Sequence, residues 1–99
     1  MIFVETHEHK KAQARAEGRG HILDAHTHTV RHRAELEASS KAGCFYCLEV
    51  FSPSEIEDWV DNDDCAMCPR CGIDSVIGDA SGFPIRDKAF LKEMNEFWF

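Results

Sequence analysis

Five cysteines occur in the chain, and four of them form two pairs with the spacing of metal ligands. Cys44 and Cys47 are separated by two residues, as are Cys68 and Cys71, and twenty residues lie between the pairs. Each short turn directs two sulfurs at one point, so the two turns predict one tetrahedral ion held by four thiolates at about 2.3 Å. We expect one structural Zn²⁺ ion, because four protein ligands leave no open position for a catalytic water.

Two other arrangements of the same sulfurs are compatible with the spacing. Cys65 and Cys68 form a third Cys-x-x-Cys pair that competes with Cys68 and Cys71, although it lacks the Pro69 and Gly72 that shape a metal turn. Iron in a rubredoxin-like site uses the same four ligands, so zinc is inferred from its prevalence and not from geometry. The fifth cysteine, Cys65, is then a spare thiol.

A second group of side chains offers different chemistry. His28 and His32 have the i, i+4 separation of metal ligands on a helix, and Glu35, Asp74 or Asp79 could complete a second site. The glutamate of a His-Glu-x-x-His motif is missing between the two histidines, so a protease of that type is not supported. The alternative functional hypothesis is therefore a small metal-dependent hydrolase that acts on a phosphoester.

Size and charge exclude several classes of protein. At 99 residues the chain suits one domain, and a core of this size gains materially from a metal cross-link. Residues 24–99 carry seven basic and fifteen acidic side chains, whereas residues 1–23 carry four basic and three acidic ones. Because nucleic-acid binding depends on Lys and Arg at the phosphates, we expect a protein partner or a second copy of the chain instead. Lys10, Lys11 and Arg15 would have to supply any nucleic-acid contacts.

The predicted compartment is the cytoplasm. No segment approaches the roughly 18 apolar residues of a membrane span, and the short apolar start of the chain is followed by Glu5 and His7. Five cysteines in a reducing compartment are better explained as metal ligands than as disulfides.

The residue pattern predicts a flexible N-terminal extension over residues 1–23 and a zinc-binding domain over residues 24–99. Within the domain we expect a helix from about Thr27 to Ala38 that carries both histidines on one face, followed by a linker over residues 39–43. A second helix should start at Ser52, because Ser52-Pro53-Ser54-Glu55 has the form of a capping box, and should run to about Val60.

Strands are expected on either side of that helix and after the second metal turn. Leu48 to Phe51 alternates in a period of two, Cys65 to Met67 leads into the second turn, and Ile73 to Ile77 should pair back against one of them. A last helix begins at an Asp87 cap and places its apolar residues at helical spacing. The predicted fold class is a small α+β domain like a zinc ribbon or treble clef, with a short antiparallel sheet and two to three helices.

The chain from His28 onward resembles a family of small bacterial zinc-ribbon-like proteins, generally labelled as cytoplasmic proteins of unknown function. The motifs that carry the resemblance are His28-x-x-x-His32-Arg33, Gly43-Cys-Phe-Tyr-Cys47, Phe51-Ser-Pro-Ser-Glu-Ile-Glu-Asp-Trp59, the run from Cys68 to Gly82, Phe90-Leu-Lys-Glu-Met94 and Trp98-Phe99. It does not reach residues 1–23, and Asn62-Asp-Asp-Cys65 stands where relatives look to have a Gly-Gln-Thr-like turn. The resemblance implies a zinc-binding fold and brings no activity with it.

The sequence therefore favours a zinc finger or zinc-ribbon domain that mediates protein interactions in the cytoplasm. The metal is structural, and the precise role is left open.

Overall fold

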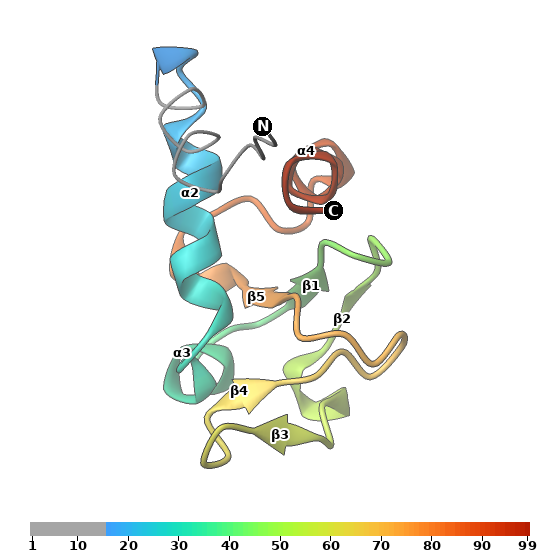
Figure 1. The fold of residues 1–99 in the computed structure, drawn as a ribbon. Helices are drawn as coiled ribbons and strands as arrows, with labels where there is room; N and C mark the ends of the chain where they lie inside the picture. Colours follow the sequence, from blue (N-terminus) through green and yellow to red (C-terminus); the bar gives the residue numbers. More distant parts are fainter. Residues whose placement is uncertain (1–15) are drawn as a thin grey trace, which may run out of the picture.

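The computed structural model describes residues 16–99, which form a small α+β domain (Figure 1). Its helices are α2 (Gly20–His26), α3 (Arg33–Glu37) and α4 (Lys88–Trp98). The strands are β1 (Ala42–Cys44), β2 (Val50–Phe51), β3 (Trp59–Val60), β4 (Cys65–Ala66) and β5 (Val76–Gly78). Single 3₁₀ turns lie at Thr27–Thr29 (η1), Pro53–Glu55 (η2) and Asp79–Ser81 (η3). The predicted fold class of short antiparallel sheets with three helices is confirmed for these residues.

The larger sheet has three antiparallel strands in the order β2-β1-β5. Ala42 pairs with Phe51 on one side and with Gly78 on the other, so β1 is the central strand. The prediction assigned residues 39–43 to a linker and paired the Ile73 segment with Leu48–Phe51 or Cys65–Met67, and both points were wrong. Ala42 and Gly43 have low strand propensity, so burial against both neighbours overrides the local preference.

Gly43 is required because other chain segments pack close to its Cα, and not because the backbone makes a tight turn there. A Cβ atom built on Gly43 would lie 3.2 Å from the carbonyl oxygen of Ile85 and 3.4 Å from Leu91. A larger residue would push α4 and the segment before it away from the sheet.

The smaller sheet is the β3–β4 hairpin, and it replaces the second predicted helix. The capping box is present, with the Ser52 side chain accepting from the backbone and Glu55 bonding back to Ser52. The turn stops at Ile56, whose backbone is extended, because Trp59 and Val60 pair with Ala66 and Cys65 in the hairpin. The cap was therefore predicted correctly, and the length of the helix was not.

The first predicted helix is also interrupted. After η1 the chain is extended at Val30 and left-handed at Arg31, with φ of 47°, before α3 begins at Arg33. The backbone N–H of His32 donates to the carbonyl of Asp64 and that of Arg33 donates to the Asp64 carboxylate. These bonds to the β3–β4 hairpin are available only because the helix breaks, so His28 and His32 do not share one helical face.

The predicted boundary at residues 23 and 24 falls inside α2. Ile22 is fully buried and Leu23 is nearly so, which places both in the core, so residues 20–23 do not belong to a flexible extension. Residues 1–15, the rest of that predicted extension with Lys10, Lys11 and Arg15, lie outside the described residues.

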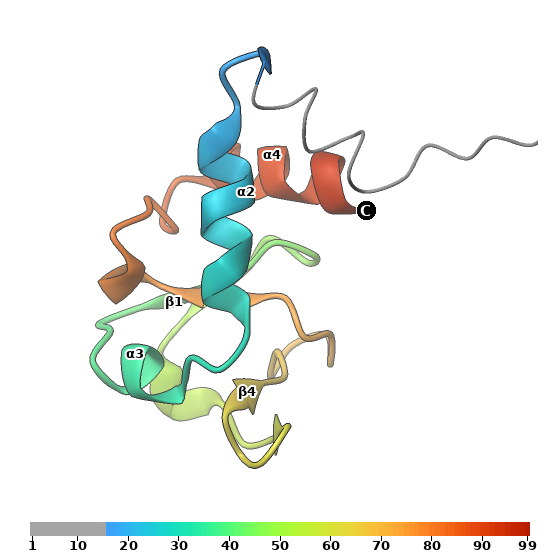
Figure 2. The same ribbon diagram turned by 60° about the vertical axis from the view of Figure 1, so that its left-hand side comes forward.

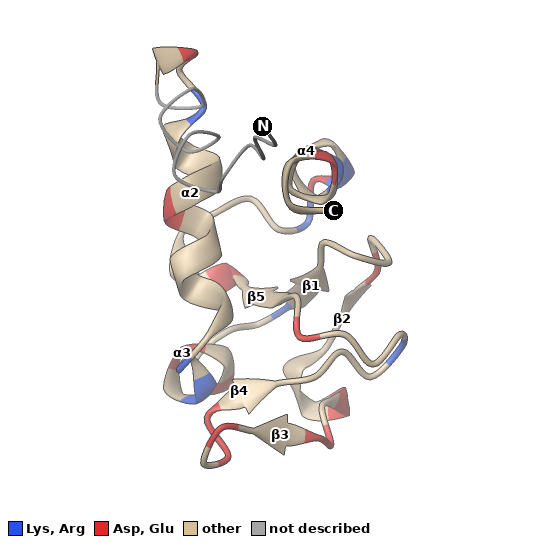
Figure 3. Ribbon diagram, in the orientation of Figure 1, with Lys and Arg blue, Asp and Glu red and all other residues tan. Residues whose placement is uncertain are grey.

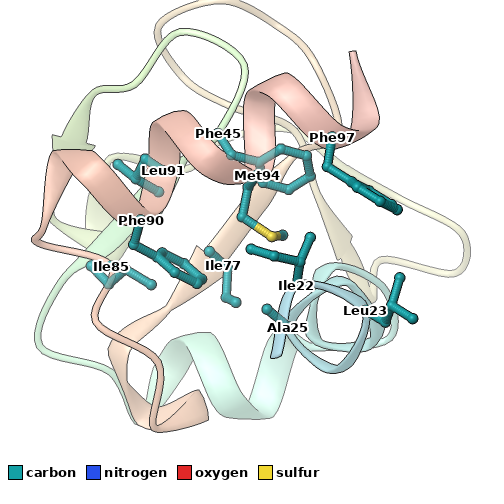
Figure 4. Packing of buried hydrophobic residues seen from close by; sticks show 10 residues of the cluster. All are labelled: Ile22, Leu23, Ala25, Phe45, Ile77, Ile85, Phe90, Leu91, Met94 and Phe97. Atoms are coloured by element: carbon teal, nitrogen blue, oxygen red, sulfur yellow. The ribbon is translucent and has the colours of Figure 1, made fainter. Parts of the chain in front are cut away.

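The last helix, α4, forms as predicted and supplies much of the core. The Asp87 side chain accepts from the backbone N–H of Ala89, which caps the helix. In Figure 4 the α2 side chains Ile22 and Ala25 face Met94 and Phe90 of α4 around Ile77 of β5. The helices α2 and α4 thus close over one side of the sheet, as the turned view in Figure 2 shows.

A second group of buried side chains lies between the sheet, α3 and the β3–β4 hairpin. It contains Leu36, Phe51, Ile56 and Val76, and two of the paired cysteines, Cys44 and Cys68, belong to it. The chain therefore has two adjoining cores, and the cysteines lie in the one that is farther from α4.

No helix among residues 16–99 is both long and apolar enough to cross a bilayer.

We predict that Leu91→Ala lowers the free energy of unfolding by about 2–5 kcal/mol, because Leu91 is fully buried and its removal leaves a cavity. Lys92→Ala on the exposed side of the same helix should stay within about 0.5 kcal/mol of the parent protein. Urea unfolding followed by circular dichroism measures both. Equal losses in the two variants would contradict the packing of α4 described above.

Candidate metal centre

The two cysteine pairs lie on backbone turns of the same construction. In the first, the N–H of Leu48 donates to the Cys44 carbonyl at 2.8 Å, and the N–H of Cys44 donates to the Glu49 carbonyl at 3.0 Å. In the second, Gly72 donates to Cys68 and Cys68 donates to the Ile73 carbonyl, both at 2.9 Å. Each turn ends on a left-handed residue, with φ of 65° at Leu48 and 79° at Gly72.

Both turns direct backbone N–H groups at the first sulfur of their pair. Cys44 Sγ accepts from the N–H of Tyr46 at 3.3 Å and of Cys47 at 3.5 Å, and Cys68 Sγ accepts from the N–H of Arg70 at 3.3 Å. Hydrogen bonds to a sulfur stabilise its thiolate form, which is the form that binds metal. The turns therefore prepare Cys44 and Cys68 to act as ligands.

The four sulfurs converge from the end of β1 and from the segment after β4. All four lie within 4.8 Å of one another. The edges Cys44–Cys71 and Cys47–Cys68 are both 3.7 Å. A tetrahedral ion with ligands at about 2.3 Å separates them by about 3.8 Å, so this arrangement fits a four-thiolate metal centre.

The electrostatics of the thiols also favour a cation. Burial raises the pKa of Cys47 to about 11 and raises that of Cys71 as well, and the nearby Cys44 sulfur adds to both shifts. At Cys68 burial acts in the same direction, but the N–H groups of Arg70 and Cys71 outweigh it and lower the pKa. Four ionised sulfurs at these distances repel one another, and a bound divalent ion removes that repulsion and releases the protons.

Among residues 16–99, these four cysteines are the only group of three or more His, Cys, Asp or Glu side chains placed to hold a metal ion. No protein-family model, curated protein or solved structure matches the chain. The interpretation of the site therefore depends on its geometry.

Cys65 lies outside the cluster. It is buried, and its Sγ points to the carbonyl oxygen of Thr29 at 3.6 Å. Burial, reinforced by Asp74, Asp61 and Asp64, raises the pKa of this thiol. The competing Cys65–Cys68 pair is therefore not formed, and Cys65 is the spare cysteine.

The residues of the predicted second metal site do not form a ligand group. His28 Nδ1 lies 3.0 Å from both carboxylate oxygens of Glu35, while the His32 ring is buried against β4. Asp79 accepts from the backbone N–H groups of Ser40 and Lys41 and from Arg86, which together hold its pKa low against the effect of burial. Asp74 is exposed, and it is not among the residues that converge on a metal position.

His32 instead connects the chain before α3 to the hairpin that leads into the second turn. Its Nδ1 lies 2.7 Å from the carbonyl oxygen of His28, and its Nε2 lies 3.0 Å from the backbone nitrogen of Ala66. Because a backbone N–H can only donate, Nε2 is the acceptor and the proton is on Nδ1. Both ring nitrogens are thus occupied in the neutral form, and neither can bind a metal.

Ser75 is a residue of the site that sequence reasoning did not identify. It is 1% exposed, and its hydroxyl lies 3.0 Å from Cys44 Sγ. When Cys44 is a thiolate, its sulfur accepts from two backbone N–H groups, and the Ser75 hydroxyl can donate a third hydrogen bond to it. Ser75 therefore helps to orient this ligand. Serine is too common in loops and strands for its position after Cys71 to have indicated this role.

We predict that Ser75→Ala weakens metal binding by about tenfold or more, since partners behind a ligand typically contribute 10- to 100-fold to affinity. Competition for Zn²⁺ with a chromophoric chelator measures the change. Ser54→Ala, an exposed serine in η2, is the matched control and should leave the affinity unchanged. An unaltered affinity in Ser75→Ala would show that the hydroxyl does not support Cys44.

We also predict that His32 makes stability depend on pH. Burial lowers its pKa below the ordinary value of 6.5, despite the raising effects of the His28 carbonyl, Glu35 and Asp64. The unfolded chain then binds a proton more readily than the folded one, so this contribution to stability is complete above about pH 6.5 and is lost as the pH falls toward the folded-state pKa.

Urea unfolding of the metal-loaded protein between pH 7 and 5, with metal content checked at each pH, measures this effect. The slope of unfolding free energy against pH should be smaller in His32→Gln, and His21→Gln, which changes an exposed histidine, should keep the parent slope. Equal slopes in all three proteins would exclude His32 as the source.

Proposed function

We propose that the four cysteines hold one structural Zn²⁺ ion and that the domain is a protein-interaction module of the bacterial cytoplasm. The observation that carries the metal assignment is the closed tetrahedral set of Cys44, Cys47, Cys68 and Cys71 sulfurs. Zinc is preferred to iron because it is the common occupant of such sites in small intracellular domains. Four thiolates fill its coordination sphere, so the metal stabilises the fold and does not activate water.

The interaction role is supported by the surface. The described chain exposes several large apolar side chains, among them Tyr46 and Phe99, which are 47% and 59% exposed. Figure 3 marks acidic residues in red along the loops of the β3–β4 hairpin, and residues 24–99 carry fifteen acidic against seven basic residues. Exposed aromatic residues on an anionic body suit a protein partner better than nucleic acid.

The cytoplasmic location and the relation to small bacterial zinc-ribbon-like proteins are parts of the same proposal. Both rest on the cysteine usage and on the motifs between His28 and Gly82. The hydrolase alternative gains no support from the described residues, because His28, His32, Asp74 and Asp79 do not converge on a common metal position.

We predict that the purified protein contains one zinc per chain and that a strong chelator unfolds the region from Cys44 to Ile85. The ion would cross-link two distant chain segments in a domain with a small core, so its loss should remove much of the folding free energy. Elemental analysis and circular dichroism with and without chelator measure both effects.

Cys44→Ser/Cys68→Ser should lose the metal and the fold, whereas Cys65→Ser is the control and should keep both. A folded double variant without metal would contradict the structural role. A second equivalent of metal that disappears in His28→Ala/His32→Ala would favour the hydrolase instead.

The interaction part is tested by sizing of the zinc-loaded protein and by affinity capture of partners. A folded, zinc-loaded protein that remains monomeric and captures nothing would count against it.

A further inference from the structure

A hollow of about 440 Å³ lies beside the metal centre and has no part in metal binding. Its lining comes from the end of α2, the segment after it, the first cysteine turn, the segment before β5 and the C-terminal end of the chain from α4. Its lining includes His26, Phe45, Asp74, Ser75, Trp98 and Phe99. This volume is within the range of pockets that hold small ligands or single large side chains.

Four of the eight residues that line the hollow carry aromatic rings. The rings of His26 and Trp98 are stacked with centroids 3.9 Å apart, and the Phe45 and Phe99 rings are 5.7 Å apart. Tyr46 packs edge-on against Phe99 at 4.8 Å, which extends this surface over the first turn. Aromatic faces carry negative partial charge and attract cations placed over them.

The charges around the hollow have the same sign. Asp74 presents an exposed carboxylate at its edge, and no Lys or Arg is among the residues that line it. Its floor includes Ser75, whose hydroxyl is 3.0 Å from Cys44 Sγ. A Zn²⁺ ion with four thiolates has a net charge of about −2, so the loaded centre adds negative potential from below.

Contacts between an arginine side chain and an aromatic ring already occur within the domain. The Arg33 guanidinium lies 4.4 Å from the centroid of the Trp59 ring, and that of Arg19 lies 5.6 Å from the Phe97 ring. The guanidinium group is planar, so it can stack on an aromatic face while it donates hydrogen bonds to a carboxylate. The hollow has no Lys or Arg to pair with an anion, and the Asp74 carboxylate at its edge favours a cation over a neutral apolar group.

We propose that this hollow binds an arginine side chain of a partner protein, with the guanidinium against the aromatic rings and paired with Asp74. The inference rests on the proposed role of the domain in protein interactions and specifies the chemistry of the partner. An acidic domain thereby gains a specific recognition site for a basic segment.

The test uses the full-length, zinc-loaded protein and a capped Gly-Arg-Gly peptide as the probe. Heteronuclear NMR titration should show saturable shifts of the amides of Asp74, Ser75 and Phe99, with dissociation in the millimolar range expected for one side chain, of order 1 mM. The same peptide with citrulline in place of arginine keeps the shape and loses the charge, so it should not bind at these sites. No arginine-dependent shift up to about 20 mM peptide would overturn the proposal.

Asp74→Asn should weaken arginine binding by about fivefold or more. Glu57→Gln removes the same charge from an exposed position that does not line the hollow, and it should stay within about twofold of the parent affinity. Equal weakening in both variants, or equal binding of the citrulline peptide, would show a general charge effect and overturn the proposal. The NMR spectra also report whether each variant is folded.

Failure of this site is distinguishable from failure of the proposed function. A protein that contains one zinc and captures a partner equally well with Asp74→Asn retains the proposed function and loses the arginine site. A protein without zinc, or one that captures no partner, loses the function whatever the peptide does.

Discussion

The convergence of four sulfurs is the constraint on which the rest of this domain depends. Cys44 ends the central strand and Cys47 follows it, while Cys68 and Cys71 follow the β3–β4 hairpin, so the four-cysteine cluster joins the three-stranded sheet to the hairpin. Cys44 and Cys68 are also part of one hydrophobic core, while Phe45, inside the first turn, belongs to the other. The metal centre therefore lies where the two cores meet, and neither core is large enough to be expected to fold alone.

The site was largely predictable from the sequence because its signals are local. A Cys-x-x-Cys turn depends on a few neighbouring residues, and the glycine after Cys71 indicated the left-handed residue that closes the second turn. The equivalent position in the first turn is Leu48, which was assigned to a strand, since leucine gives no sign of a positive φ. The caps at Ser52 and Asp87 were correct for the same local reason.

The errors concern features decided by contacts between distant parts of the chain. The helical pattern around His28 and His32 is real, but bonds from His32 and Arg33 to Asp64 favour a break in the helix. The strand β1 has poor strand residues and forms because both of its neighbours pair with it. Of the two histidines with ligand spacing, His32 is a buried structural imidazole and His28 is a partly buried hydrogen-bond partner of Glu35. Spacing alone could not reveal this difference, because it depends on which way the backbone turns between them.

The likeness of the two cysteine turns has a consequence for the metal-free chain. Glycine tolerates a positive φ at no steric cost, whereas a leucine in the left-handed region costs about 1 kcal/mol or more. In the absence of the ion the two halves of the centre should therefore not relax alike: the turn closed by Gly72 can persist, and the turn closed by Leu48 has reason to open. An ion would then bind first to Cys68 and Cys71, in the turn that keeps its conformation, and afterwards to Cys44 and Cys47.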